Sequence, residues 1–84
     1  MKELRWNEEK SLKLKKERGV SFDEIVAGNF LGIEKHPSRD NQWLMVFDVD
    51  GYCWVVPYVD GGDHYFMKTA FPSRKHTKIY LKGT

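Results

Sequence analysis

The amino-acid sequence predicts one α+β domain, in which N-terminal helices pack on an antiparallel β-sheet meander and a short helix ends the chain. Three observations lead to this prediction. The chain has 84 residues, of which 40% are hydrophobic, and this is enough for one core only. Capped helical patterns fill its first third, and two apolar runs around an Asp-Gly pair follow. We therefore expect residues 1–84 to form a single domain.

The first helix is expected over Glu8–Arg18. Asn7 can cap its start and Gly19 can end it, while the acidic and basic residues at its two ends suit the helix dipole. The apolar stripe of this helix is thin. Leu12 and Leu14 lie about 200° apart around a helix, so only one of them can point fully into a core.

The second helix is expected to begin at Ser21. Ser21 and Glu24 have the spacing of a capping box, and Val20 and Ile25 can form the hydrophobic staple that accompanies it. The glycines that follow break this helix. A first strand is then expected over residues 30–34.

A β-hairpin is the clearest pattern in the chain. The runs Trp43–Val49 and Tyr52–Tyr58 flank Asp50-Gly51, the pair that a two-residue type I′ turn requires. Phe47 then opposes Trp54, and every aromatic side chain of the hairpin falls on one face. We assign that face to the core rather than to base stacking, because so short a chain needs large side chains inside. Both faces are apolar, which places the hairpin at the sheet centre.

The remaining elements are a further strand and a short helix. Val59–Asp63 reads as a turn, and His64–Ala70 is expected to return as a strand and complete the meander. Pro57 cannot donate to a ladder, so we expect it at a strand end or a bulge. Residues 73–82 alternate as in a strand, yet Pro72-Ser73 resembles a helix start, and we favour the helix.

Charge is distributed unevenly along the chain. The formal net charge is +2, but residues 64–84 carry five Lys and Arg and no acid, whereas residues 37–63 carry one Arg against five Asp. A basic segment of this kind favours a polyanion or an acidic protein as partner. An ordinary solvated surface with scattered cations is the alternative.

Several classes of protein are not expected. Cys53 is the only cysteine, so no internal disulfide can form, and no Cys/His spacing fits a zinc site. The aspartates cluster at turns, where Asp is ordinary, and we expect no metal and no cofactor. No apolar run has the length of a signal peptide core or a membrane span. These features suit a cytoplasmic protein.

The basic segment contains the residues that could carry chemistry. Lys68 interrupts an apolar strand pattern, and only five residues separate it from Arg74. A turn at Pro72 could bring Lys68, Arg74 and Lys75 to one spot, where three cations favour a phosphate. A lysine that extends from an edge strand to solvent is the alternative for Lys68.

Metal-free RNA cleavage requires a base for the 2′-hydroxyl, cations for the phosphorane and an acid for the leaving 5′-oxygen. His64, His76 and Tyr80 are candidate proton carriers, and Lys78 is a further cation. On a helix, His76 and Tyr80 share a face. Packing for Tyr80 and plain surface positions for the histidines remain alternatives.

The order of these motifs resembles that of BrnT-type toxins. The matching segments are Trp6–Lys10, Arg18–Glu24, the glycine-centred hairpin and Lys68–Lys75. The resemblance implies a RelE-like fold, endoribonuclease activity within a type II toxin-antitoxin system, RNA as the substrate and a cognate antitoxin as partner. It places Arg74 and Lys75 at the functional basic motif, Lys68 on the strand before it and Tyr80 on the terminal helix.

Two main hypotheses follow. In the first, the chain is a toxin that cleaves RNA and inhibits translation, with Lys68, Arg74, His76 and Tyr80 as catalytic residues. Lys75, Lys78 and His64 would then bind the RNA, which is mRNA either free or on the ribosome. In the second, a non-catalytic RelE-like module uses the same basic end to bind nucleic acid or an acidic protein. An inactive remnant of a toxin is a third, lesser possibility.

The capping box gives a stability prediction. Replacing Ser21 with Ala removes the oxygen that accepts an amide at the start of the second helix, and it should lower the free energy of unfolding by ~0.5–2 kcal/mol. Urea denaturation of both proteins measures the change. Equal midpoints would show that Ser21 does not cap a helix.

Overall fold

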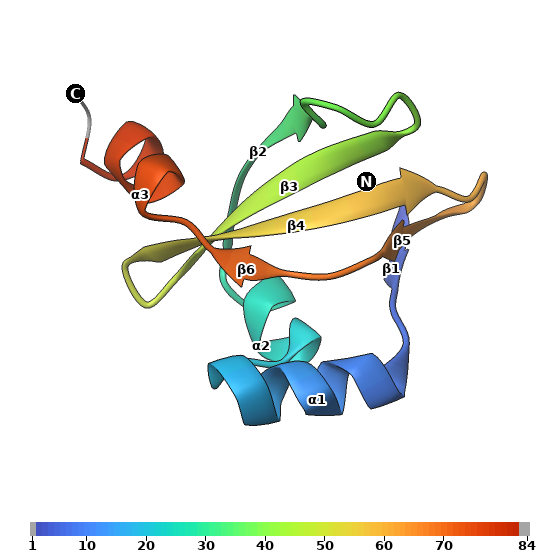
Figure 1. Ribbon diagram of the computed structural model, residues 1–84, viewed down its shortest axis with the longest axis horizontal. Helices are drawn as coiled ribbons and strands as arrows, with labels where there is room; N and C mark the ends of the chain where they lie inside the picture. The colour runs from blue at the N-terminus through green and yellow to red at the C-terminus, as the bar shows by residue number, and fades with distance from the viewer. Residues whose placement is uncertain (1, 83–84) are drawn as a thin grey trace.

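A computed structural model describes residues 2–82 (Figure 1). Within these residues, one short strand and two helices precede five strands and a final helix, and the strands form one sheet. The elements are β1 (Glu3–Arg5), α1 (Glu8–Arg18), α2 (Phe22–Val26), β2 (Asn29–Lys35), β3 (Gln42–Val49), β4 (Tyr52–Asp60), β5 (His64–Met67), β6 (Phe71–Pro72) and α3 (Arg74–Tyr80).

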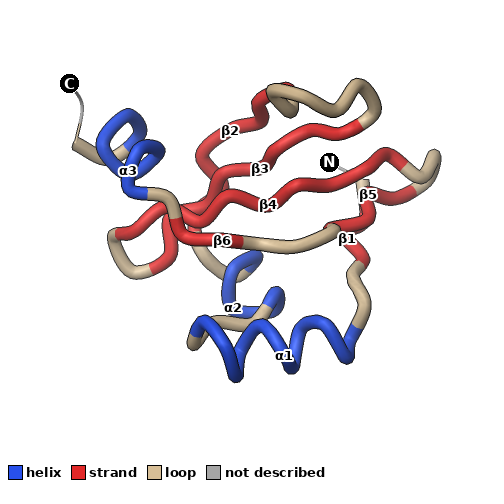
Figure 2. Tube along the Cα trace, in the orientation of Figure 1, coloured by secondary structure: helices blue, strands red, loops and turns tan. Residues whose placement is uncertain are grey.

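The sheet has the order β1-β5-β4-β3-β2, and β6 pairs with another part of β4 (Figure 2). Strands β2 to β5 form the antiparallel meander that the sequence predicts. β1 was not predicted, and it pairs with β5 in parallel, so the sheet is mixed. No sequence signal indicated β1 because it is only three residues long and polar at both ends.

The predicted hairpin is confirmed residue by residue. Asp50 and Gly51 have φ angles of 53° and 86°, as a type I′ turn requires. Phe47 pairs with Trp54, and Trp43 pairs with Tyr58 at the far end of the ladder. β3 and β4 lie in the middle of the sheet, so their two apolar faces are both available for helices.

The N-terminal helices cover one face of the hairpin. α1 starts at the predicted Asn7 cap and ends at the left-handed Gly19, and α2 has the complete capping box of Ser21 and Glu24. Leu14 is buried while Leu12 is 68% exposed, as the thin stripe of α1 predicted. Both helices pack on one core cluster, whose fully buried members are Phe22, Ile25, Met45, Val56, Met67 and Ala70.

The opposite face of the hairpin carries Val46, Cys53 and Val55, which are also fully buried. α3 packs against β4 on this side, where the Cys53 amide donates to the buried Thr77 hydroxyl at 2.8 Å. The short helix that the sequence favoured after Pro72 is therefore confirmed. None of the helices within residues 2–82 has the length and apolar character to cross a membrane.

Two expectations about the later strands were wrong. The strand predicted over residues 64–70 ends at Met67, and Pro57 lies inside β4 rather than at a strand end or bulge. The two errors have one cause. β5 pairs with residues 58–60 of β4 and β6 pairs with residues 54–55, so Pro57 lies between the two partners on that edge. Its missing N–H therefore costs no ladder hydrogen bond.

Gly28 gives a test of how closely α2 approaches the sheet. A Cβ atom at this position would collide with the backbone oxygen of Asp48. We expect Gly28→Ala to lower the free energy of unfolding by about 1–3 kcal/mol, the usual cost of overpacking. Gly32→Ala is the control, because its Cβ would lie 3.6 Å from Tyr80, an ordinary contact. Equal stability of the two variants in urea denaturation would contradict the close approach.

Candidate active site

α3 is held on the sheet by hydrogen bonds at its first turn. Ser73 caps the helix with its side chain, and its own N–H donates to the Cys53 carbonyl at 2.9 Å. The Thr77 hydroxyl donates to the Ser73 carbonyl at 2.7 Å while it accepts the Cys53 amide. These contacts satisfy buried polar groups of β4, so they fix where the side chains of α3 lie.

Two of the predicted proton carriers meet on one carboxylate. The Tyr80 hydroxyl donates to Glu34 Oε2 at 2.6 Å, and His76 Nε2 lies 3.2 Å from Glu34 Oε1. The rings of His76 and Tyr80 are stacked, as their spacing on one helix face predicts, with centroids 6.2 Å apart. Ser73 Oγ lies 2.7 Å from His76 Nδ1 on the other side of the ring. We call Glu34, Ser73, His76 and Tyr80 the Glu34 cluster.

The cluster sets the protonation states of two of its members. The Tyr80 hydrogen bond lowers the pKa of Glu34 below its usual 4.5. Burial opposes this shift, and His76 and the charge of Lys75 add to it. The same hydrogen bond, with burial, raises the pKa of Tyr80 to about 12. Near neutral pH, Glu34 is therefore a carboxylate, and Tyr80 keeps its proton and can only donate it.

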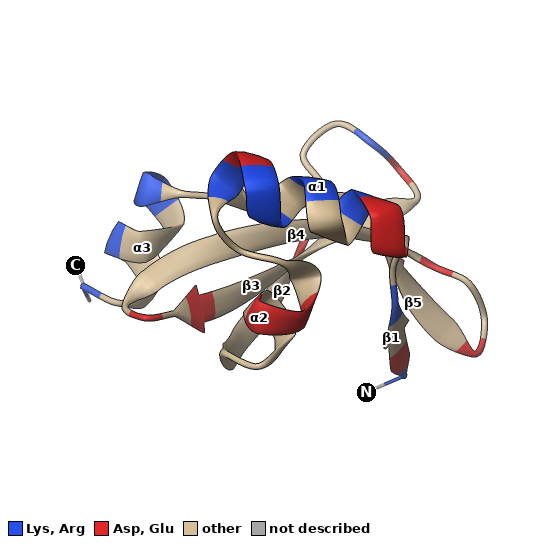
Figure 3. Cartoon of the chain, turned by 90° about the horizontal axis from the view of Figure 1, so that it is seen from below, with Lys and Arg blue, Asp and Glu red and all other residues tan. Residues whose placement is uncertain are grey.

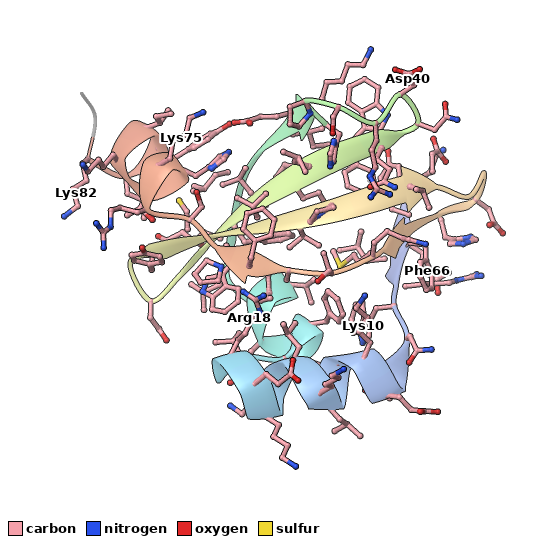
Figure 4. All side chains as sticks on the ribbon, in the orientation of Figure 1. Lys10, Arg18, Asp40, Phe66, Lys75 and Lys82 are labelled. Carbon is pink, nitrogen blue, oxygen red and sulfur yellow. The ribbon has the colours of Figure 1, made fainter. Side chains whose placement is uncertain are left out.

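α3 also carries cations, of which Lys75 acts on Glu34, while Arg74 and Lys78 lie about 160° around the helix axis from His76. Arg74, Lys75 and Lys78 are exposed on α3, which contains no acidic residue. Figure 3 shows the Lys and Arg positions of α3 without an acidic position on the same helix, and Figure 4 shows Lys75 on the same helix. Within residues 2–82, no ion pair involves a Lys or Arg of α3. These positive charges are therefore available to an anion from solution.

Lys68 does not join Arg74 as the sequence suggested. Its N–H donates to the Pro57 carbonyl, whereas the N–H of Ser73 donates to Cys53. These acceptors are four residues apart on β4, which is about 13 Å along a strand. The Lys68 ammonium lies 5.7 Å from the Phe66 ring centroid, and Figure 4 shows Phe66 at the opposite end of the sheet from α3. The extended β6 separates the two cations where a tight turn at Pro72 was expected.

His64 also lies apart from the Glu34 cluster. It begins β5, and its Nδ1 lies 2.8 Å from the neighbouring Asp63 carboxylate. Figure 1 shows this end of β5 far from α3. Of the seven residues singled out in the sequence, α3 carries five, namely Arg74, Lys75, His76, Lys78 and Tyr80, with His76 and Tyr80 on one face and Arg74 and Lys78 on another.

Sequence reasoning missed two members of the cluster. Glu34 is 42 residues from His76 and 46 from Tyr80, so no local spacing relates them. Its only signal was an acidic side chain in a short extended segment. Ser73 had a clearer signal, since it follows Pro72 at the helix start, but it was considered only as a boundary. Among residues 2–82, no group of three or more His, Cys, Asp or Glu is placed to hold a metal ion.

Comparison with known proteins supports the fold that the motif order predicted. No protein-family model matches the chain, and no curated protein matches it in sequence. The described residues form an α+β fold with a mixed six-stranded sheet and three helices. A solved structure with this fold is the Brucella abortus ribonuclease toxin BrnT. It superimposes with a TM-score of 0.58 at 11% identity, and the match covers 87% of this chain and 97% of that one.

The charge on Glu34 gives a prediction for stability against pH. Because its folded pKa is lower than the usual 4.5, its contribution is complete above that pH and is lost as the pH falls through the folded value. We expect Glu34→Gln to lower the free energy of unfolding by about 1–2 kcal/mol at pH 7, with allowance for partial exposure.

The difference between Glu34→Gln and the unchanged protein should shrink as the pH falls below 4.5, where Glu34 becomes neutral like Gln. Urea denaturation at a series of pH values measures it. A difference that stays constant with pH would show that the charge of Glu34 contributes nothing. As a second readout, the variant should lower the pKa of Tyr80 from about 12 in an absorbance titration.

Proposed function

We propose that the chain is the toxin of a type II toxin-antitoxin system, an endoribonuclease that cleaves RNA without metal and inhibits translation. One observation carries this proposal. A chain with the fold of a ribonuclease toxin holds an imidazole and a phenol on one carboxylate, on a helix that also carries three exposed cations. Proton carriers next to positive charge are the groups that phosphodiester cleavage requires.

Each group has a role in the proposed reaction. Arg74 and Lys75 hold the scissile phosphate and stabilise the charge that develops on it, while Lys78 binds the neighbouring backbone. His76 moves the proton of the 2′-hydroxyl, and Glu34 orients its ring. Tyr80 keeps its proton near neutral pH, so it serves as a donor and not as the base. Lys68 and His64 lie too far from the cluster to act in this chemistry.

The proposal implies two partners. The first is RNA, which the exposed cations of α3 attract through its phosphates. The second is an antitoxin that neutralises the toxin by covering the same cations, and an acidic segment would suit this surface. A protein that acts on cellular RNA in this way would work in the cytoplasm.

A non-catalytic binding module is the second candidate, and a specific contact favours it. Glu34 already forms hydrogen bonds with the Tyr80 hydroxyl and with one nitrogen of His76. These hydrogen bonds also connect α3 to β2. Such a module would bind RNA or an acidic protein through Arg74, Lys75 and Lys78 without any proton transfer.

The test of the proposed function is RNA cleavage by the purified chain in the presence of EDTA. We expect cleavage by the unchanged protein and a loss of at least about 100-fold in rate for Arg74→Ala, because a charge that contacts the phosphate stabilises the transition state. Arg39→Ala is the matched control, since Arg39 lies in the exposed loop between β2 and β3. Intact RNA with the unchanged protein, or equal rates for the two variants, would contradict the proposal.

The double variant His76→Ala with Tyr80→Phe separates the two candidate functions. It should abolish cleavage while the protein still binds a single-stranded DNA oligonucleotide, whose binding is followed by fluorescence anisotropy. Reversal of charge at Arg74 and Lys75 should abolish both properties. If cleavage is absent and only charge reversal weakens binding, the module is the better description.

A further inference from the structure

Both ring nitrogens of His76 are engaged by neighbouring side chains. Nδ1 lies 2.7 Å from Ser73 Oγ, and Nε2 lies 3.2 Å from Glu34 Oε1. The side chain of His76 is only 13% exposed, so little of the ring is open to solvent. A hydroxyl, an imidazole and a carboxylate thus form a continuous chain of hydrogen bonds, the arrangement that activates a hydroxyl in many enzymes.

The direction of each hydrogen bond follows from the chemistry of the groups. Glu34 is a carboxylate near neutral pH and can only accept, so the proton of the neutral imidazole lies on Nε2. Nδ1 then has a lone pair and no proton. The Ser73 hydroxyl must therefore donate to Nδ1, and this hydrogen bond uses the one basic lone pair that His76 has.

Ser73 retains one acceptor position for a ligand. A hydroxyl has one proton and two lone pairs. The proton goes to His76 Nδ1, and one lone pair accepts the backbone N–H of His76 at 3.1 Å. The other lone pair has no partner among the hydrogen bonds of residues 2–82. Ser73 is also followed directly by Arg74 and Lys75, the cations that would hold a phosphate beside it.

We propose that the Ser73 hydroxyl is a catalytic residue that relays the 2′-hydroxyl proton of RNA to His76, with Glu34 as the positioning residue for the imidazole. This inference rests on the proposed function. It differs in the atom that takes the proton directly from the substrate. The substrate meets Ser73 Oγ and not the histidine ring, because the lone pair of the ring is already occupied.

The proposed step balances as follows. The 2′-hydroxyl passes its proton to Ser73 Oγ while Ser73 passes its own proton to His76 Nδ1. The 2′-oxygen forms a bond to phosphorus, and the bond from phosphorus to the 5′-oxygen breaks. The 5′-oxygen takes the proton of the Tyr80 hydroxyl, and the tyrosinate that remains takes the proton of the imidazolium through water. The products are a 2′,3′-cyclic phosphate and a 5′-hydroxyl end.

Ser73 is also the N-cap of α3, so the experiment must separate capping from catalysis. Glycine is a tolerated N-cap and costs only a few tenths of a kcal/mol relative to Ser, while Thr keeps both the cap and the hydroxyl. Ser73→Gly should therefore remain folded but lose at least about 100-fold in kcat, the usual contribution of a proton-transfer group. Ser73→Thr should stay within about 10-fold of the unchanged protein, because its hydroxyl can make the same hydrogen bonds.

Ser21→Gly is the matched control, because the Ser21 side chain also accepts the backbone N–H three residues along, at the start of α2, and lies outside the cluster. It should lose a similar amount of stability and keep the cleavage rate. If Ser73→Gly cleaves RNA as fast as Ser21→Gly does, Ser73 is only a helix cap and the inference is wrong. If the unchanged protein leaves RNA intact, the proposed function fails and the relay fails with it.

Nitrogen NMR of His76 gives a readout that a structural cap would not change. In the neutral ring, the ¹⁵N shifts should show the proton on Nε2. Ser73→Gly should change the shift of Nδ1, because this nitrogen loses the hydrogen bond to its lone pair. A proton on Nδ1, or an unchanged Nδ1 shift in Ser73→Gly, would overturn the relay even in a protein that cleaves RNA.

Discussion

The pairing of β3 with β4 is the constraint on which the rest of the structure depends. The Asp50-Gly51 turn fixes the register, and a shift of one residue would exchange the two faces of each strand. In the observed register, one face receives α1 and α2, and the other receives α3. Both faces are apolar, so each side of the hairpin needs a helix to cover it. The candidate site exists because α3, the helix on the second face, carries the cations.

The edge of β4 that faces away from β3 decides where α3 lies. Two short strands share this edge, with Pro57 between them, so the chain continues along β4 after β5 instead of turning away. This path carries residue 73 to Cys53 and delivers α3 to the face opposite α1. It also moves Arg74 away from Lys68. A single local exception, a proline inside a central strand, thus separates Lys68 from Arg74 and brings His76, Tyr80 and the charge of Lys75 to Glu34.

Signals of short range in the sequence predicted most of the fold. The caps of α1 and α2, the hairpin with its register, and the start of α3 each depend on residues within a few positions of one another, and all are confirmed. β1 and the division between β5 and β6 were missed, because each depends on a pairing with a distant strand. The residues of the site also divide into those that a local spacing predicted and those that it did not. The spacing of His76 and Tyr80 predicted their common face, but nothing near them in sequence indicated Glu34.

The exposure of Glu34 bears on what its cluster contributes. Its side chain is 37% exposed, and hydrogen bonds at such positions add only about 1 kcal/mol to stability, since water competes for the same groups. The buried Thr77 already fixes α3 to β4, so the helix does not need Glu34 to stay in place. A polar network that adds little stability at the edge of a sheet, beside unpaired cations, is better suited to a ligand than to the fold. Its value lies in the orientation that it imposes on the imidazole, because a ring held at both nitrogens presents one defined proton path.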